Sequence, residues 1–271
     1  MTGVPGLSEL AADPLLAEVF EARRDGLLLL DYDGTLAPFR VEREKAGPYP
    51  GVVDMLRRLP SRGGGRFVVI SGRMAGEVEA FLRPAIPAEI WGCHGAQRLR
   101  PGGEPRTPAL KPHWAKALER AADMAAAYVA PGALERKDVS LALHWRGMEA
   151  SRRERLRRHI EPLWSRLARE AGLAAHPFDG GLELRPPDWD KGGAVRTLRR
   201  ENPDAILVYL GDDRTDEDAF QALDASGLGV LVRSGPRPTA ARYRITPPDE
   251  LLRFLGLWAQ GVTAQGAGPG R

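Results

Sequence analysis

Cysteine is nearly absent from this chain: Cys93 is the single thiol among 271 residues. One thiol excludes an intrachain disulfide framework and a metal site built from cysteines. The sequence also lacks an apolar run of the roughly 18 residues that a membrane-spanning helix needs, and a charged-then-apolar signal pattern at its start. We therefore expect a cytoplasmic protein without a membrane-embedded part, because a reducing compartment suits a chain without disulfides.

Charge of one sign is nowhere concentrated as in nucleic-acid-binding proteins, which carry basic runs with interleaved aromatic residues. The 39 lysines and arginines and the 36 acidic residues leave a net charge of only +3. The arginine-rich segment 151–170 carries Leu156, Ile160, Leu163 and Leu167 at helical spacing, which predicts a helix whose arginines face solvent. We expect a monomer that acts on a small molecule and binds no nucleic acid.

Short apolar segments alternate with helical patterns over most of the chain. Six segments have the composition of buried strands: residues 26–33, 66–71, 89–95, 205–213, 227–232 and 241–246. Pro50 opens one helical pattern between them, and acidic residues occupy the first turn of another, where the helix dipole favours them. This alternation predicts an α/β fold with a doubly wound, Rossmann-like parallel sheet covered by helices on both faces.

The middle of the chain breaks this rhythm. Residues 113–129 predict a helix, 134–146 an alternating strand, 150–172 a long helix and 173–178 a further strand. We interpret residues 108–182 as an α+β cap domain inserted into the parallel-sheet core, which then comprises residues 1–107 and 183–258. Residues 259–271 lack a pattern that could bury one face, and we expect them to be disordered.

Acidic residues follow two of the predicted strands. Asp31 and Asp33 come directly after four leucines, and Asp212, Asp213 and Asp216 follow the strand that begins at residue 205. Because the carboxyl ends of parallel strands share one edge of a sheet, we expect the two groups to meet there. Clustered carboxylates repel one another, and a divalent cation that prefers oxygen ligands, above all Mg²⁺, resolves this conflict.

Two further features fit a site for a phosphoryl group. A predicted strand ends in Ser71-Gly72-Arg73, which offers a hydroxyl group and main-chain amides to phosphate oxygens. Lys191 opens a helical pattern and supplies a fixed cation. Each feature alone is common in proteins of other function, whereas their combination at strand ends and helix starts indicates phosphoryl chemistry.

Four segments resemble the motifs of the haloacid-dehalogenase-like phosphohydrolases: "DYDGTLAPF", "ISGR", "DKGGAV" and "GDDRTDEDAF". The segments "WGCHGAQ", "ERKDVSLALHWR" and "LELRPPDWDKGGAV" are similar to one branch, the trehalose-6-phosphate phosphatases. The resemblance extends from about residue 27 to about residue 232. It implies the α/β core of that superfamily with an inserted cap domain, and Mg²⁺ as the cofactor.

The resemblance also implies roles for the residues of the four motifs. Asp31 is expected to attack phosphorus and form an aspartyl-phosphate, and Asp33 to protonate the leaving sugar oxygen and then to activate water. Ser71 and Lys191 are expected to hold the phosphoryl oxygens. The metal ion is expected to be bound by Asp31, the main-chain carbonyl of Asp33 and Asp212, with Asp213 and Asp216 in support.

The sugar-phosphate substrate is expected to be recognised beside the motifs and in the cap domain. The family usually has a glutamate where this chain has Gln97, which puts sugar specificity rather than chemistry in question. The residues that the resemblance implies for substrate binding are Gly72, Arg73, His94, Gly95, Gln97, Lys137, Ser140, His144, Glu183 and Arg185.

The function that follows is Mg²⁺-dependent hydrolysis of trehalose 6-phosphate to trehalose and phosphate. A related phosphatase for sucrose phosphate or a glycosylated phosphoglycerate shares the same chemistry and stays open. A phosphotransfer receiver also uses an aspartate, neighbouring acids and a lysine, but it is about half this length and has no inserted domain. A non-catalytic regulatory domain is disfavoured because Asp31, Asp33, Lys191 and Asp212 are all present.

Overall fold

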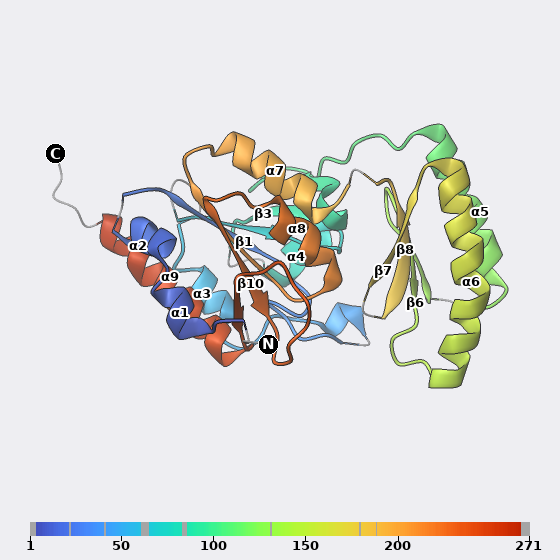
Figure 1. Cartoon of the computed structure of the whole chain (residues 1–271). Coiled ribbons are helices and arrows are strands. Elements are labelled where there is room, and N and C mark those ends of the chain that lie inside the picture. Colours follow the sequence, from blue (N-terminus) through green and yellow to red (C-terminus); the bar gives the residue numbers. More distant parts are fainter. Residues whose placement is uncertain are drawn as a thin grey trace. The chain divides into compact units, whose positions relative to one another are not determined.

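The chain divides into two compact units, which are coloured along the sequence in Figure 1. Unit 1 comprises Met1–Pro105 and Lys191–Arg271, and unit 2 comprises Arg106–Asp190. Unit 2 is thus an insertion between two segments of unit 1. The computed structural model describes residues 4–21, 23–40, 42–60, 65–82, 86–130, 132–178, 180–187 and 189–266.

A seven-stranded sheet forms the centre of unit 1. Its order is β11-β10-β9-β1-β2-β3-β4, and all neighbours are parallel except β3 and β4. The strands are β1 (Gly26–Leu30), β2 (Phe67–Ile70), β3 (Glu89–Gly92), β4 (Gln97–Leu99), β9 (Ile206–Gly211), β10 (Gly227–Val232) and β11 (Tyr243–Ile245). The six strands and the doubly wound sheet predicted from the sequence are confirmed. Strand β4 was missed because three residues are too short to show a pattern.

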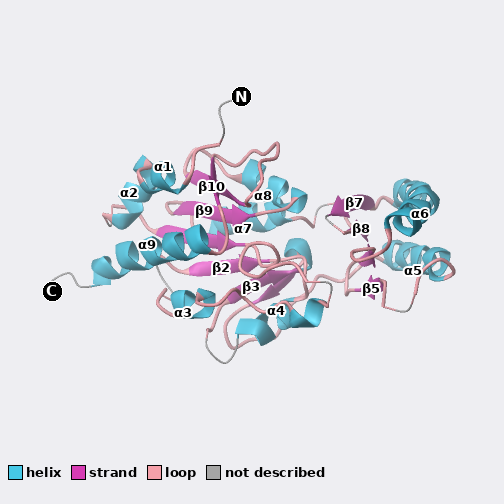
Figure 2. Ribbon diagram, turned by 90° about the horizontal axis from the view of Figure 1, so that it is seen from below, coloured by secondary structure: helices cyan, strands magenta, loops and turns pink. Residues whose placement is uncertain are grey.

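Helices cover both faces of this sheet (Figure 2). One face packs against α1 (Leu7–Ala11), α2 (Pro14–Phe20), α3 (Val52–Leu56), α4 (Ala75–Leu82) and α9 (Asp249–Gly266). The other face packs against α7 (Lys191–Glu201) and α8 (Glu217–Ala222). No helix among the described residues has both the length and the apolar character needed to cross a membrane.

Strand β1 shows why four leucines precede the first acidic pair. Leu28 and Leu30 pack in the core on one face of the sheet, and Leu27 and Leu29 pack in the core on the other. A strand covered on both faces has no solvent-facing position, so it reads as an unbroken apolar run. The strand therefore holds the residue that follows it, Asp31, in a rigid frame.

Helix α9 corrects the prediction that disorder begins at residue 259. The helix continues to Gly266, and Ala259 is only 5% exposed. A helix whose first turns are anchored propagates into sequence that has no amphipathic pattern of its own. The remaining residues of the predicted tail, 267–271, lie outside the described part of the chain. The anchoring side chains, all fully buried, are Leu251, Phe254, Leu255 and Trp258.

Unit 2 is an antiparallel four-stranded sheet with two helices packed on one face. The sheet order is β5-β6-β8-β7. Its elements are β5 (Leu134–Arg136), β6 (Leu141–His144), β7 (Ala174–Phe178), β8 (Gly181–Arg185), α5 (Pro112–Ala126) and α6 (Ala150–Ala171). Apolar side chains of both helices and of the sheet form one core cluster, which includes Trp114, Leu143, Ile160, Trp164 and Leu184.

Two expectations for the insertion need correction. The single strand expected at residues 134–146 is a hairpin, because β5 and β6 pair antiparallel with Leu134 opposite Leu143. The second boundary lies at Asp190 rather than at residue 182. Strand β8 pairs with β7 along its whole length and with β6 over residues 181–184, so its residues belong to unit 2.

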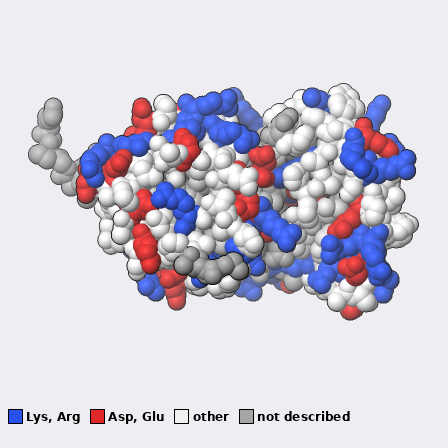
Figure 3. All heavy atoms as spheres, in the orientation of Figure 1, with Lys and Arg blue, Asp and Glu red and all other residues white. Residues whose placement is uncertain are grey.

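Helix α6 carries the arginine-rich segment. Leu156, Ile160 and Leu167 are buried as predicted, and the arginines pair with glutamates along the exposed face, as for Arg157 with Glu161. Figure 3 shows positive and negative atoms mixed over the surface of the molecule on the side that is drawn. Leu163 was predicted to be buried but is 37% exposed, because the buried stripe is centred nearer Trp164 and Ala168.

Trp164 is expected to be a main source of stability in unit 2. Its side chain is fully buried, and its Nε1 donates a hydrogen bond to the main-chain oxygen of Ala121 at 3.1 Å, which joins α6 to α5. Trp164→Ala should therefore lower the free energy of unfolding by about 3–5 kcal/mol. Leu163→Ala, at the exposed neighbouring position, should change it by less than about 1 kcal/mol. Urea unfolding and amide hydrogen exchange in residues 106–190 measure the two effects, and equal losses would contradict this account of the helix packing.

Candidate active site

The carboxyl ends of three neighbouring strands bring the predicted motifs to one edge of the large sheet. Strand β1 pairs with β2 and with β9, and the main-chain N–H of Asp31 donates to the Leu210 oxygen at 2.9 Å. Asp31, Ser71 and Asp212 each follow one of these strands directly. Parallel strands end at a common edge, and ligand sites of doubly wound sheets lie there. The predicted meeting of the two acidic groups is therefore confirmed within unit 1.

Lys191 links the two acidic groups. It is the first residue of α7, it is 2% exposed, and its Nζ donates to Asp31 Oδ1 at 2.6 Å and to Asp216 Oδ1 at 2.7 Å. Burial by itself lowers the pKa of Lys191, but the charges of Asp216 and Asp31 outweigh this and hold it above its usual range. Lys191 is therefore a permanent buried cation between two carboxylates.

Asp31 is a buried carboxylate with other carboxylates close to it. Burial raises its pKa to about 7; the charge of Lys191 opposes this shift, and the charges of Asp216 and Asp33 add to it. The hydroxyl of Thr35, which is fully buried, lies 3.4 Å from Asp31 Oδ2. Sequence reasoning missed Thr35, although it lies in the "DYDGT" motif. A bound cation would counter the burial and the acidic neighbours that raise this pKa.

Asp216 is a junction in this network. Its Oδ1 accepts hydrogen bonds from Lys191 and, at 2.6 Å, from the hydroxyl of Tyr209, a fully buried residue of β9. Its Oδ2 accepts the main-chain N–H groups of Asp212 and Asp213 at 3.0 and 2.9 Å. A carboxylate accepts about four hydrogen bonds. Asp216 is therefore saturated by protein donors and fits a supporting role better than direct metal binding.

The Asp212 carboxylate fits a metal ion. Its Oδ1 is buried and accepts no hydrogen bond from any described residue. Burial, followed by the charges of Asp31 and Asp216, raises the pKa of Asp212 well above its usual value. A Cβ atom at Gly34, where φ is +87°, would lie 2.3 Å from Asp212 Cγ, so only glycine leaves room for the carboxylate.

The donor set also suits Mg²⁺. Carboxylate oxygens of Asp31, Asp212 and Asp216 lie within 4.8 Å of one another, and all three residues are buried. Hard oxygen ligands of this kind are those that Mg²⁺ prefers. Asp213, predicted as a supporting ligand, is half-buried, and its side chain accepts the N–H of Arg214 at 2.7 Å. This hydrogen bond ties the Asp213 carboxylate to the main chain of its own loop.

Asp33 and Arg73 form a two-pronged ion pair. Arg73 donates from Nε to Asp33 Oδ2 at 2.7 Å and from Nη2 to Asp33 Oδ1 at 2.8 Å. The guanidinium group is buried and lies 5.5 Å from the ring centre of Tyr32 and 5.3 Å from that of Phe81. Arg73 was predicted to bind substrate; the structure gives it a fixed partner in Asp33. It therefore orients this carboxylate.

Ser71, Gly72, His94 and Gly95 come together at the end of β2. The main-chain N–H of His94 donates to the Ser71 oxygen at 2.9 Å, and a Cβ atom at Gly72 would lie 2.6 Å from the His94 ring. Cys93 and His94 both adopt positive φ, of 49° and 57°, in the turn that ends at Gly95. This turn packs the His94 ring against the Ser-Gly-Arg segment. Substrate contacts of these residues stay a prediction.

Gln97 has a structural contact. It is 5% exposed, and its Oε1 accepts the main-chain N–H of Ala75, the first residue of α4, at 2.6 Å. The first N–H groups of a helix have no partner within the helix, so this bond caps α4. The predicted sugar contact of Gln97 is not among these interactions.

The predicted cap residues form a polar cluster in unit 2. Glu183 Oε1 accepts hydrogen bonds from Lys137 Nζ at 2.9 Å and from Ser140 Oγ at 2.7 Å. Leu182 and Leu184 pack in the core on the helix side of the sheet. Because side chains alternate along a strand, Glu183 lies on the opposite face. Unit 2 therefore carries a buried, charged cluster on the sheet face opposite its own two helices.

Four further residues extend this polar face. His144 Nε2 lies 2.8 Å from Glu135 Oε2, and Arg185 is 2% exposed. His176 lies directly opposite Glu183 in the register of β7 and β8, so the two side chains are on the same face of the sheet. Burial, with the charge of Arg185 second, lowers the pKa of His176 to about 4, so its ring is neutral near pH 7. Sequence reasoning missed His176 and Glu135, whose positions carry no motif.

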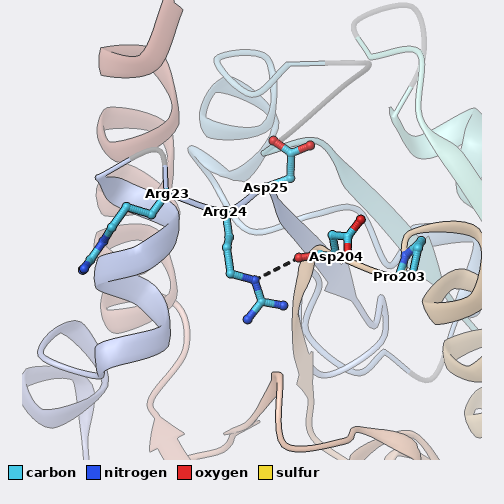
Figure 4. Close-up of a pocket in the computed structure, with 5 residues that line it drawn as sticks. All are labelled: Arg23, Arg24, Asp25, Pro203 and Asp204. Carbon is cyan, nitrogen blue, oxygen red and sulfur yellow. Dashed lines mark hydrogen bonds between the residues drawn. The ribbon is translucent and has the colours of Figure 1, made fainter.

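A separate pocket lies at the opposite edge of the large sheet. Its volume is about 500 Å³, and it is lined by Arg23, Arg24, Asp25, Pro203 and Asp204 (Figure 4). These residues precede β1 and β9, at the amino-terminal ends of the strands. Arg24 Nε already donates to the Asp204 main-chain oxygen at 2.9 Å. Asp31, Asp212 and the other motif residues lie at the carboxyl ends of the same strands, so this pocket is not the candidate active site.

Comparison with known proteins agrees with this geometry. The sequence profile of the trehalose-phosphatase family matches residues 29–249. The chain is 30% identical to a trehalose-phosphate phosphatase of Mycobacterium marinum, over 90% of this chain and 65% of that protein. It is 31% identical to a bifunctional trehalose-6-phosphate synthase/phosphatase of Thermoproteus tenax, over 88% of this chain and 32% of that protein. The chain thus spans less than two thirds of these relatives' lengths.

A solved structure shares the fold. The C-terminal domain of C. albicans trehalose-6-phosphate phosphatase superposes with a TM-score of 0.80 at 24% identity, over 96% of this chain and 99% of that one. At this identity the similarity concerns the fold alone. The match of the family profile to most of the sequence decides the relationship: the chain belongs to the trehalose-phosphatase family.

Proposed function

We propose that this protein hydrolyses trehalose 6-phosphate to trehalose and phosphate with the help of Mg²⁺. The observation that carries the proposal is the buried Lys191, which donates to Asp31 at 2.6 Å within the three-carboxylate cluster. A cation and a potential metal site beside one carboxylate are what an attack on a phosphoryl group needs. Family membership and the names of the relatives support the substrate.

In the first half-reaction Asp31 is the nucleophile. One of its carboxylate oxygens attacks phosphorus and forms an aspartyl-phosphate, while the bond from phosphorus to the sugar oxygen breaks and Asp33 gives its proton to that oxygen. Arg73 engages both oxygens of Asp33. Proton donation therefore requires at least one of these hydrogen bonds to open when substrate binds.

In the second half-reaction Asp33 acts as a base. It takes a proton from water, the water oxygen attacks phosphorus, and the bond between phosphorus and the Asp31 oxygen breaks. Phosphate leaves, Asp31 is again a carboxylate and Asp33 again carries a proton. By holding the Asp33 carboxylate at a fixed angle, Arg73 sets the direction from which water is activated.

Asp31, Asp212 and the main-chain carbonyl of Asp33 would hold the metal ion, with Asp213 and Asp216 supporting the loop. When bound, Mg²⁺ neutralises phosphoryl oxygens and so allows a carboxylate to approach them. Lys191 and Ser71 would hold the remaining phosphoryl oxygens. The Asp216 contact keeps the Lys191 ammonium group in place beside Asp31.

The polar face of unit 2 is proposed to bind the sugar part of the substrate. A disaccharide has many hydroxyl groups, and the cluster of Lys137, Ser140 and Glu183 offers both donors and acceptors. His144, Arg185 and the turn at His94 belong to the same proposal. A cytoplasmic location and a monomeric state are also proposed, and size-exclusion chromatography tests the latter.

Replacement of Asp31 tests the proposed chemistry. Asp31→Asn removes the nucleophilic carboxylate, and we expect phosphate release from trehalose 6-phosphate to fall at least 1,000-fold, about 4 kcal/mol of barrier. Asp218→Asn, the same chemical change in α8, should leave the rate within about threefold. EDTA should abolish wild-type activity, and Mg²⁺ should restore it. Activity of Asp31→Asn within tenfold of wild type, or resistance to EDTA, would rule out the proposal.

Substitutions in unit 2 test the assignment of the sugar. Lys137→Ala and Glu183→Gln should each lower turnover of trehalose 6-phosphate by roughly 10- to 1,000-fold, since binding energy from the remote sugar lowers the barrier. Hydrolysis of p-nitrophenyl phosphate, which has no sugar, should change less than about threefold, as should both activities of Lys116→Ala on the exposed side of α5.

A panel of substrates identifies the sugar phosphate itself. Equal loss for trehalose 6-phosphate and p-nitrophenyl phosphate in the Lys137 and Glu183 variants would mean that unit 2 does not read sugar. Faster turnover of sucrose phosphate, a glycosylated phosphoglycerate or glucose 6-phosphate would replace the substrate and leave the phosphatase chemistry intact.

Gln97 is expected to act on stability rather than on sugar specificity. Gln97→Glu keeps an acceptor for the Ala75 N–H and places a negative charge at the start of α4, where the helix dipole favours it. Turnover of trehalose 6-phosphate should therefore stay within about twofold, whereas Gln97→Leu should lower the free energy of unfolding by roughly 1 kcal/mol. Enzyme assays and thermal unfolding measure both. A tenfold gain in turnover for Gln97→Glu would show instead that this position reads the sugar.

A further inference from the structure

Arg237 reaches from the loop after β10 to the acidic loop after β9. Its Nε donates to the main-chain oxygen of Asp212 at 3.3 Å, and its Nη2 donates to that of Asp213 at 2.8 Å. Its Nη1 donates to the main-chain oxygen of Pro238 at 2.9 Å and to Glu217 Oε1. The guanidinium group thus donates to one carboxylate and three carbonyl groups.

Glu217 completes the connection between the two loops. Its Oε1 accepts from Arg237, and its Oε2 accepts the main-chain N–H of Ala240 at 2.7 Å. The Arg237 and Glu217 side chains are only 14% and 20% exposed. The planar guanidinium group presents its donors at fixed angles, and a half-buried ion pair is poorly screened by solvent. These properties make the contact rigid.

Arg237 and Asp216 both bind the main chain of the same two residues, Asp212 and Asp213. Asp216 accepts the N–H groups of Asp212 and Asp213, and Arg237 donates to the carbonyl groups of the same residues. All four main-chain polar groups of this pair therefore have partners within the protein. The backbone that carries the Asp212 carboxylate is therefore held through both its N–H and its carbonyl groups.

We propose that Arg237 is a positioning residue for the metal site: it fixes the backbone of Asp212 and Asp213, so that the Asp212 carboxylate is held beside Asp31 before the ion arrives. The identity of the ion rests on the proposed function. Supporting residues of this kind change metal affinity by about 10- to 100-fold in other metalloproteins. Nothing in the sequence motifs indicates Arg237, which lies 25 residues after Asp212.

Positioning and charge make opposite predictions for this residue. Arg237 carries a positive charge close to a site for a cation, so by electrostatics alone its removal would tighten Mg²⁺ binding. If it acts by fixing the backbone, its removal releases the loop and weakens binding. The sign of the change in affinity therefore separates the two effects.

The test is calorimetric titration of the full chain with MgCl₂ in the absence of substrate. Arg237→Ala should bind Mg²⁺ about tenfold more weakly than wild type, and Arg237→Lys, which keeps the charge but not the planar set of donors, should also bind more weakly. Arg214→Ala is the matched control, because Arg214 is an exposed arginine of the same acidic loop, and its hydrogen bond to Asp213 comes from its main-chain N–H rather than from its guanidinium group. Its affinity should be unchanged or slightly higher.

Activity supplies a second measurement. Because the hydrogen bonds of Arg237 go to the loop that carries Asp212 and to Glu217, saturating Mg²⁺ should return turnover of Arg237→Ala to within about threefold of wild type. Affinity equal to or tighter than wild type in both Arg237 variants would overturn the inference. If Arg237→Ala does not fold, Arg237→Lys decides the question. A wild-type protein that binds no Mg²⁺ would instead overturn the proposed function, so the two failures are distinguishable.

Discussion

The ammonium group of Lys191 between Asp31 and Asp216 is the interaction on which the rest of the site depends. Buried carboxylates without a cation would be protonated or would repel one another, and a buried lysine without carboxylates would lose its charge. Breaking such a buried pair by removing one partner costs about 3–5 kcal/mol, because an uncompensated charge remains. Loss of any one of these three charged groups is therefore expected to destabilise the whole site. The strands β1 and β9 hold the groups in place.

Around this pair the protein uses main-chain contacts to keep carboxylates close together. Asp216 accepts hydrogen bonds from two main-chain N–H groups of the acidic loop. Arg237 donates hydrogen bonds to main-chain carbonyl groups of the same loop. Gly34 leaves room for the Asp212 carboxylate at a position where any Cβ atom would collide with it. Preorganisation of this kind places the cost of bringing like charges together on folding rather than on catalysis.

In the proposed function, unit 1 carries out the chemistry and unit 2 recognises the sugar. Unit 1 carries every group that the proposed phosphoryl transfer needs, and its sheet is rigid because both faces are packed. Unit 2 has a separate core and a polar sheet face that includes Glu183 and Lys137. An insertion with its own core can change its binding surface without disturbing the catalytic edge, which allows one phosphatase core to serve different sugar phosphates.

The sequence by itself determined the parallel sheet, the six strands and the meeting of the acidic motifs, because buried strands and strand-end carboxylates leave local patterns that survive in any context. It did not show that residues 134–146 form a hairpin, that α9 extends to Gly266, or that Gln97 caps α4. Only the tertiary structure decided the contacts of Arg73, Tyr209 and Arg237. Their partners come from other segments of the chain, and hydrogen bonds between distant segments have no signature in local sequence.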